Sequence, residues 1–72
     1  MIGKVIYENI NGHTLIDSNG RLFIAPYVGI QKGEEMAIDE RVVIEVPSVL
    51  FGLSVMAEKD VRRVVKFIRE KW

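Results

Sequence analysis

The chain contains no cysteine, a single histidine and no net charge, and each of these shortages excludes a class of protein. Without cysteine there is no disulfide framework of the kind that stabilises small secreted domains, and no thiolate ligand for zinc. A reducing, cytoplasmic location is therefore expected. Because ten basic residues balance ten acidic ones, strong non-specific attraction to nucleic acid or anionic lipid is not expected.

Long apolar runs are also absent. The longest covers about four to six residues, against the roughly 18 that a membrane-spanning helix requires. Met1 is followed by Ile2-Gly3-Lys4 without a basic stretch leading into an apolar one, so neither a membrane span nor a signal peptide is predicted. The 72 residues, 49% of them apolar, predict a single globular domain, residues 1–72. A domain this small has a thin core, which leaves homodimerisation open as a further source of stability.

Two Asn-Gly dipeptides, Asn11-Gly12 and Asn19-Gly20, are the clearest local signal in the chain. Asn-Gly favours the type I′ turn, because both central residues of that turn have positive φ and its twist matches that of the flanking strands. A short apolar segment containing Leu15 and Ile16 separates the two dipeptides. Their spacing predicts a three-stranded antiparallel meander with a short middle strand.

The two turns also predict a register for the meander. If each loop has two residues, Tyr7 pairs with Ile16, and Ile16 pairs with Phe23. In the same register Leu15 pairs with Ile24. Apolar side chains then lie on both faces: Val5 and Tyr7 on one, and Ile6, Leu15, Leu22 and Ile24 on the other. Such a pattern is typical of a sheet that curls into a small barrel or is covered by a helix.

The middle of the chain predicts further strands. Pro26 interrupts the third strand because it cannot donate to the hydrogen-bond ladder, and residues 27–31 are a candidate fourth strand. Residues 34–40 fit a helical turn and the entry to a strand equally well. A strand is predicted over 41–46, which is rich in β-branched residues. Another is predicted over 49–55, with an early helix start as the alternative.

From about Met56 the apolar period changes from two residues to about 3.6, as in an amphipathic helix. Ser54 is the expected N-cap. The expected buried stripe consists of Ala57, Val61, Val64, Val65, Ile68 and Trp72. The sequence thus predicts an α+β domain with about five strands, mainly within 1–55, followed by one C-terminal amphipathic helix over 56–72. The strands form a small curled antiparallel sheet or a partial barrel of SH3-like or OB-like type.

Charge is distributed unevenly along the chain. Residues 58–72 carry six basic and three acidic side chains, a net charge of +3, whereas residues 1–57 carry four basic and seven acidic ones, a net charge of −3. The outer face of the predicted helix supplies the candidate partner-binding residues: Lys59, Arg62, Arg63, Lys66, Phe67 and Arg69. This basic face suits an acidic protein surface or a phosphate backbone. The alternatives are a merely solvated face and, for Phe67, a boundary position over the sheet, which is favoured.

No catalytic or metal motif is present in the sequence. An acidic segment consists of Glu34, Glu35, Asp39 and Glu40, but its spacing is not that of an EF-hand, and a solvated loop is expected. The same carboxylates suit a basic partner surface or the basic helix of a second copy. His13 is the lone histidine, and no nucleophile motif accompanies it. We therefore expect no enzymatic activity, no cofactor and no metal.

Among the function classes that remain, the sequence favours a non-enzymatic protein-interaction module: a regulator, inhibitor or accessory subunit. Such a module would dock through the basic helix face or a sheet edge, and its expected partner is a protein with an acidic surface. The alternative is a small β-barrel that binds nucleic acid, with Tyr7, Phe23 and Tyr27 as stacking faces. The zero net charge weakens this alternative, because nucleic-acid-binding domains are usually basic.

Overall fold

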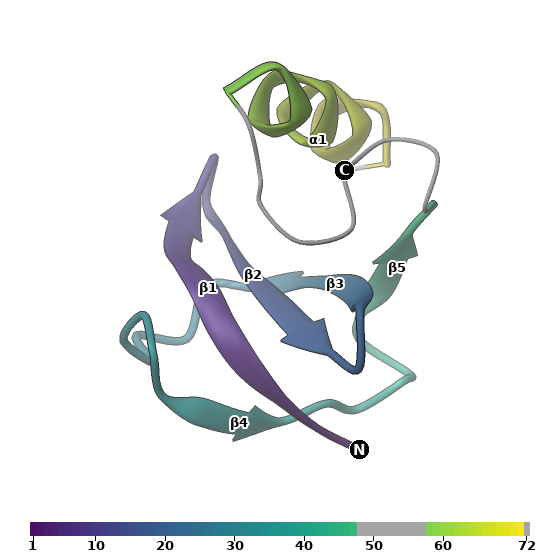
Figure 1. Ribbon diagram of the computed structural model, residues 1–72. Helices are drawn as coiled ribbons and strands as arrows, with labels where there is room; N and C mark the ends of the chain where they lie inside the picture. The colour runs from purple at the N-terminus through teal and green to yellow at the C-terminus, as the bar shows by residue number, and fades with distance from the viewer. Residues whose placement is uncertain (48–57, 72) are drawn as a thin grey trace.

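A five-stranded antiparallel sheet and one C-terminal helix make up the fold (Figure 1). The computed structural model describes residues 1–47 and 58–71. The strands are β1 (Ile2–Ile10), β2 (His13–Ser18), β3 (Arg21–Pro26), β4 (Glu35–Ala37) and β5 (Ile44–Val46), and the helix is α1 (Glu58–Lys71). The order in the sheet is β4-β1-β2-β3-β5, and the sheet is open rather than closed. The predicted α+β class is confirmed.

Both Asn-Gly dipeptides form the turns that the sequence predicts. All four residues of Asn11-Gly12 and Asn19-Gly20 have positive φ, with values between 53° and 84°. These are the left-handed conformations that a type I′ turn requires, and asparagine and glycine adopt them at the lowest cost. Each turn has two residues, so β1, β2 and β3 form the expected meander.

The predicted register is right on one side of β2 and wrong on the other. Ile16 pairs with Phe23, and Leu15 pairs with Ile24, as predicted. Tyr7, however, pairs with Leu15 instead of Ile16, because an irregularity between Tyr7 and Ile10 adds one residue to β1 relative to β2. A second irregularity, between Val5 and Tyr7, shifts the start of β1 by one residue more. Bulges bend a strand and increase its twist, and Figure 1 shows β1 curving across the sheet. The shift also moves Tyr7 to the face that packs toward α1.

Two other segments differ from the predicted strands. Residues 27–31 belong to the loop between β3 and β4 and form no strand. The ambiguous segment 34–40 contains β4, which pairs antiparallel with the start of β1. The paired residues are Ile2–Ala37, Gly3–Met36 and Lys4–Glu35. Since this pairing joins residues far apart in the chain, a local pattern of apolar residues does not reveal it.

The strand predicted over 41–46 is shortened to β5 by a turn around Asp39. The Oδ1 atom of Asp39 accepts a hydrogen bond from the backbone N–H of Arg41 at 3.0 Å, and its carbonyl oxygen accepts one from the N–H of Val42 at 3.0 Å. The turn uses the residues with which the strand was expected to begin. Outside the described residues lie the strand predicted over 49–55, the cap Ser54, and the stripe residues Ala57 and Trp72.

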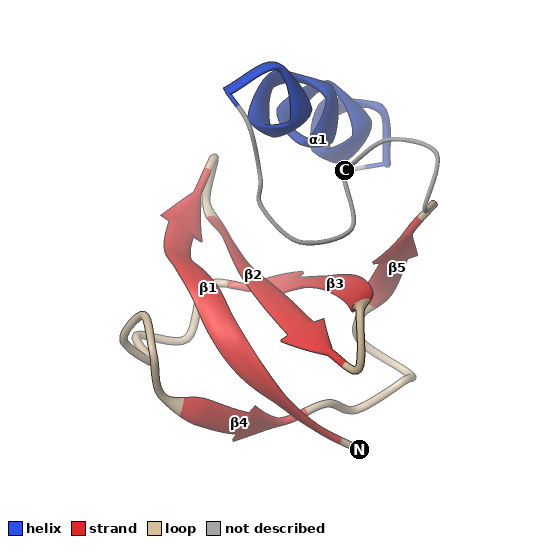
Figure 2. Cartoon of the chain, in the orientation of Figure 1, coloured by secondary structure: helices blue, strands red, loops and turns tan. Residues whose placement is uncertain are grey.

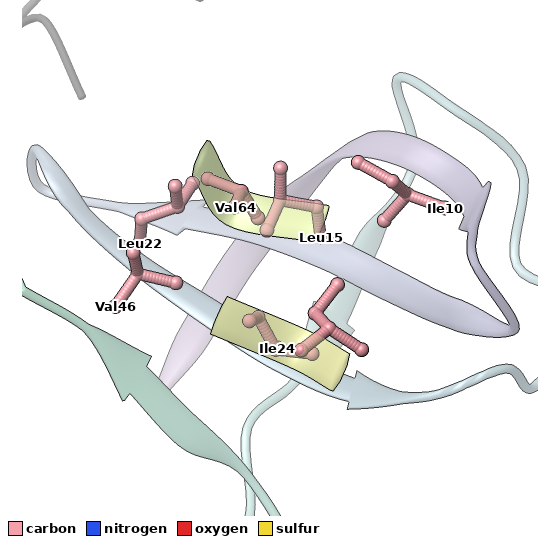
Figure 3. Close-up of a cluster of buried hydrophobic side chains, with 7 residues drawn as sticks. Ile10, Leu15, Leu22, Ile24, Val46 and Val64 are labelled. Carbon is pink, nitrogen blue, oxygen red and sulfur yellow. The ribbon is translucent and has the colours of Figure 1, made fainter. Parts of the chain in front are cut away.

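Apolar side chains fill both faces of the sheet. The helix-side cluster joins strands to helix (Figure 3), and its buried members are Ile10, Leu15, Leu22, Ile24, Val46, Val64 and Ile68. The far-side cluster consists of Ile16, Phe23, Ala25 and Ile38, with Met36 and Val43 packed against it. Residues of β3 alternate between the two clusters, as the pleat of a strand requires. The second cluster explains why the sheet carries apolar residues on the face away from α1 as well as on the face that packs against α1.

Candidate docking face

The inner side of α1 fixes the helix on the sheet. Val64 and Ile68, four residues apart, are 0% and 1% exposed within the helix-side cluster. Val61, Val65 and Phe67 are half-buried against the same cluster. Residues at this spacing share one helix face, so the described part of the predicted buried stripe is confirmed. The outer side of α1 is therefore held in a fixed orientation relative to the sheet.

The basic residues lie on the outer side of α1. All five cations that the sequence assigned to the candidate site are exposed: Lys59, Arg62, Arg63, Lys66 and Arg69. Because several like charges lie three or four positions apart, they repel one another, and an acidic partner would relieve that repulsion.

A groove runs along one flank of this outer side. Its described lining consists of Val61, Arg62, Val65, Lys66 and Arg69, and its volume is about 560 Å³. We call it the α1 groove. The two valines supply apolar surface, and the three long cations surround it. An apolar surface with a cationic rim suits a segment that carries both an apolar side chain and carboxylates.

The sequence-based site therefore divides into two parts. Arg62, Lys66 and Arg69 meet in the groove, whereas Phe67 lies on the opposite border of the buried stripe, about 160° around the helix from Arg69. Phe67 packs against the helix-side cluster, and Lys71 Nζ lies 5.7 Å from its ring centroid. The boundary position that the sequence favoured for Phe67 is the one observed.

Two groove residues were missed at the sequence level. Val61 and Val65 fall within the apolar stripe of the helix, and the sequence assigned them wholly to the core. Each is only half-buried, and the remaining surface faces the groove. Their place at the edge of the stripe, beside Arg62 and Arg69 on the helical wheel, is the signal that could have identified them.

An acidic end lies opposite the helix. Figure 2 shows α1 at one end of the molecule and β4 at the other. We define the acidic end by the exposed carboxylates of Glu34, Glu35 and Glu40. The fourth acid of this segment, Asp39, is paired with Arg41 at 3.0 Å, and hydrogen bonds from Arg41 lower the pKa of its carboxyl group.

The remaining candidates do not assemble a chemical site. His13 is half-buried beside the first turn, where its Nδ1 donates to the carbonyl oxygen of Asn11 at 3.1 Å. Of the three candidate stacking rings, Phe23 is buried, Tyr7 is half-buried and Tyr27 is exposed. Within residues 1–47 and 58–71 no group of three or more potential ligands could hold a metal ion.

Similarity to known proteins assigns no function to this chain. Comparisons with family models, with curated proteins and with solved structures find no match to this chain. In the part of the chain that the structure describes, no helix has the length and apolar character needed to cross a membrane. The features of this chain that bear on its function are therefore the geometry and charge of α1 and of the acidic end.

Proposed function

We propose that this protein is a small, non-enzymatic protein-interaction module that binds an acidic surface of a partner protein through the outer face of α1. The observation that carries the proposal is the α1 groove, in which Val61 and Val65 lie beside Arg62, Lys66 and Arg69. Electrostatic complementarity at such a face accelerates association and selects the partner, while the apolar contact lowers the rate of dissociation.

A protein partner is favoured over nucleic acid by the charge outside the helix. Residues 1–57 carry a net charge of −3, so a phosphate backbone that extended beyond α1 would meet repulsion. In addition, Tyr27 is the one exposed aromatic residue among those described, and single-stranded nucleic acids usually stack on several. A short acidic protein segment fits within the limits of one helix face.

The test compares three immobilised baits in an extract of the source cell: the wild type, Lys66→Glu/Arg69→Glu, and a control, Lys4→Glu/Lys32→Glu. The two variants change the net charge equally, and all four substituted side chains are exposed. We expect quantitative mass spectrometry to find an acidic protein that the wild type and the control retain and the α1 variant loses. Equal retention by all three baits would refute the proposal, and retention that nuclease treatment abolishes would indicate nucleic-acid binding instead.

A further inference from the structure

We propose that the acidic end of a second copy occupies the α1 groove, so that the protein self-associates head to tail. The inference rests on the proposed function, because it names the partner of the same helix face. The two surfaces lie at opposite ends of one molecule, as Figure 2 shows, so one copy cannot bring them together. Since they differ from each other, their contact is heterologous, and it leads to chains or to a closed ring rather than to a symmetric dimer.

The acidic end is held in place by the backbone. The N–H of Val5 donates to the carbonyl oxygen of Glu34 at 2.9 Å, and the N–H of Ile38 donates to the carbonyl oxygen of Met1 at 2.7 Å. These bonds lie on either side of β4, which is itself paired with β1. The carboxylates of this end therefore project from a fixed scaffold, which reduces the conformational entropy lost on binding.

The acidic end also carries apolar surface. Directly paired residues of antiparallel strands point to the same face, and the pairs Ile2–Ala37 and Lys4–Glu35 share the outer face of β1 and β4. Ile2 is 65% exposed, which is the largest exposure among the large apolar residues described. Ile2 and Ala37 thus offer an apolar contact for the valines of the groove, while Glu34 and Glu35 offer carboxylates to its cations.

The charges of the two ends attract each other only weakly within one molecule. The shortest dimension of the protein is 20 Å, whereas the Debye length at physiological salt is about 8 Å. Charges at opposite ends of one molecule are therefore screened from each other. Two copies in contact bring opposite charges within a few ångströms, where screening is much weaker.

Sedimentation velocity over a range of concentrations tests the proposal, in about 10 mM and about 1 M NaCl. We expect association at low salt that weakens at high salt. Lys66→Glu/Arg69→Glu and Glu34→Lys/Glu35→Lys are each expected to weaken it by about tenfold or more, since attraction becomes repulsion. The variant with all four substitutions has the net charge of the wild type. Its two ends have exchanged their signs and are again complementary, so we expect it to associate.

The control Lys4→Glu/Lys32→Glu separates a local contact from an effect of net charge. It carries the same net charge as the α1 variant, but it leaves the α1 groove intact and makes the acidic end more negative, because Lys4 pairs with Glu35 there, so it should still associate. The inference would be overturned if the α1 variant and the control lost association equally, or if the wild type were monomeric at every concentration and salt. It would also be overturned if the variant with all four substitutions stayed monomeric while circular dichroism showed it to be folded. The proposed function would survive these results if the wild type and Glu34→Lys/Glu35→Lys retained an acidic protein that the α1 variant lost.

Discussion

Gly3 illustrates how closely β1 approaches its neighbours. A Cβ atom at this position would lie 2.5 Å from Ile16 Cγ2 and 2.9 Å from both the carbonyl oxygen of Asp17 and Ile38 Cδ1. Gly3→Ala is therefore expected to lower the free energy of unfolding by about 2 kcal/mol, as in other overpacked cores. Urea denaturation measures the change. Lys4→Ala at the exposed neighbouring position is the control, with an expected effect of less than about 0.5 kcal/mol.

Thr14 supports the irregular part of β1. It is fully buried, and its Oγ1 donates to the carbonyl oxygen of Glu8 at 3.0 Å. Thr14→Val keeps the shape of the side chain but removes this donor, so we expect a loss of about 1–2 kcal/mol in unfolding free energy. Thr14→Ser, which keeps the hydroxyl, should preserve the bond in β1. A valine variant as stable as the wild type would show that the bond contributes nothing.

The two turns and the register of β1 differ in how far the local sequence predicts them. The Asn-Gly turns follow from the φ values that asparagine and glycine tolerate, and they need no distant partner. The irregularity between Tyr7 and Ile10 is instead bridged by Thr14, which lies on a different strand and donates to the carbonyl oxygen of Glu8. The sequence therefore predicts where the hairpins turn, while the register that places Tyr7 under α1 requires tertiary contacts.

At the scale of elements, one ion pair joins β3 to β5. Arg21 Nη2 and Nε donate to the two carboxylate oxygens of Glu45 at 2.7 Å and 3.0 Å. These hydrogen bonds, together with the charge of Arg21, hold the pKa of Glu45 below its ordinary value. A carboxyl group with a lowered pKa in the folded state stabilises the protein above its unfolded pKa. That stabilisation is lost as the pH falls through the folded-state value.

Glu45→Gln should therefore make the stability less sensitive to acid. We expect the decline in unfolding free energy between about pH 5 and pH 2 to be shallower in the variant than in the wild type. Urea denaturation at several pH values measures this slope. Arg21→Gln should flatten it similarly, and the double variant should add nothing further. A slope unchanged in all three variants would mean that the pair does not contribute to the acid sensitivity.

Phe67 separates the stabilising side of α1 from its proposed docking side. Because the ring is half-buried against the helix-side cluster, Phe67→Ala is expected to lower the unfolding free energy by about 2 kcal/mol. Capture of the acidic partner under conditions where the variant is folded should be unchanged. Lys66→Glu/Arg69→Glu should give the opposite result, with normal stability and no capture. Loss of capture in folded Phe67→Ala would instead return Phe67 to the docking face.

The elements differ in how well the sequence predicts them. The period of the apolar residues places α1 and its inner face correctly, since a helix is built from local spacing. Strands β4 and β5 have three residues each, and pairing with distant strands defines them. The cations of the candidate site follow from the helical wheel. The groove depends on how much of Val61 and Val65 is buried against the helix-side cluster, and tertiary packing determines that.

At the scale of the whole molecule, the zero net charge conceals two separated patches of opposite sign. On α1, the five exposed cations form several like-charged pairs three or four residues apart, and each costs about 0.2–0.5 kcal/mol. The acidic end, with Glu34, Glu35 and Glu40, lies at the opposite end of the molecule from α1, beyond the reach of strong attraction at physiological salt. The helix of the folded monomer thus keeps a net positive charge, with repulsion among its cations, even though the formal charge of the chain is balanced.

Added salt should therefore stabilise the monomer while it weakens any self-association. At protein concentrations low enough to avoid association, we expect the unfolding free energy to rise by about 0.5–1 kcal/mol between about 10 mM and 150 mM NaCl. Lys66→Glu/Arg69→Glu should show little of this increase, because the new carboxylate at position 66 attracts Arg62 and Arg63 instead of repelling them. Lys4→Glu/Lys32→Glu leaves α1 unchanged, so its salt response should resemble that of the wild type. A wild type destabilised by salt would show that attraction between the two ends, rather than repulsion on α1, dominates the electrostatics of the folded chain.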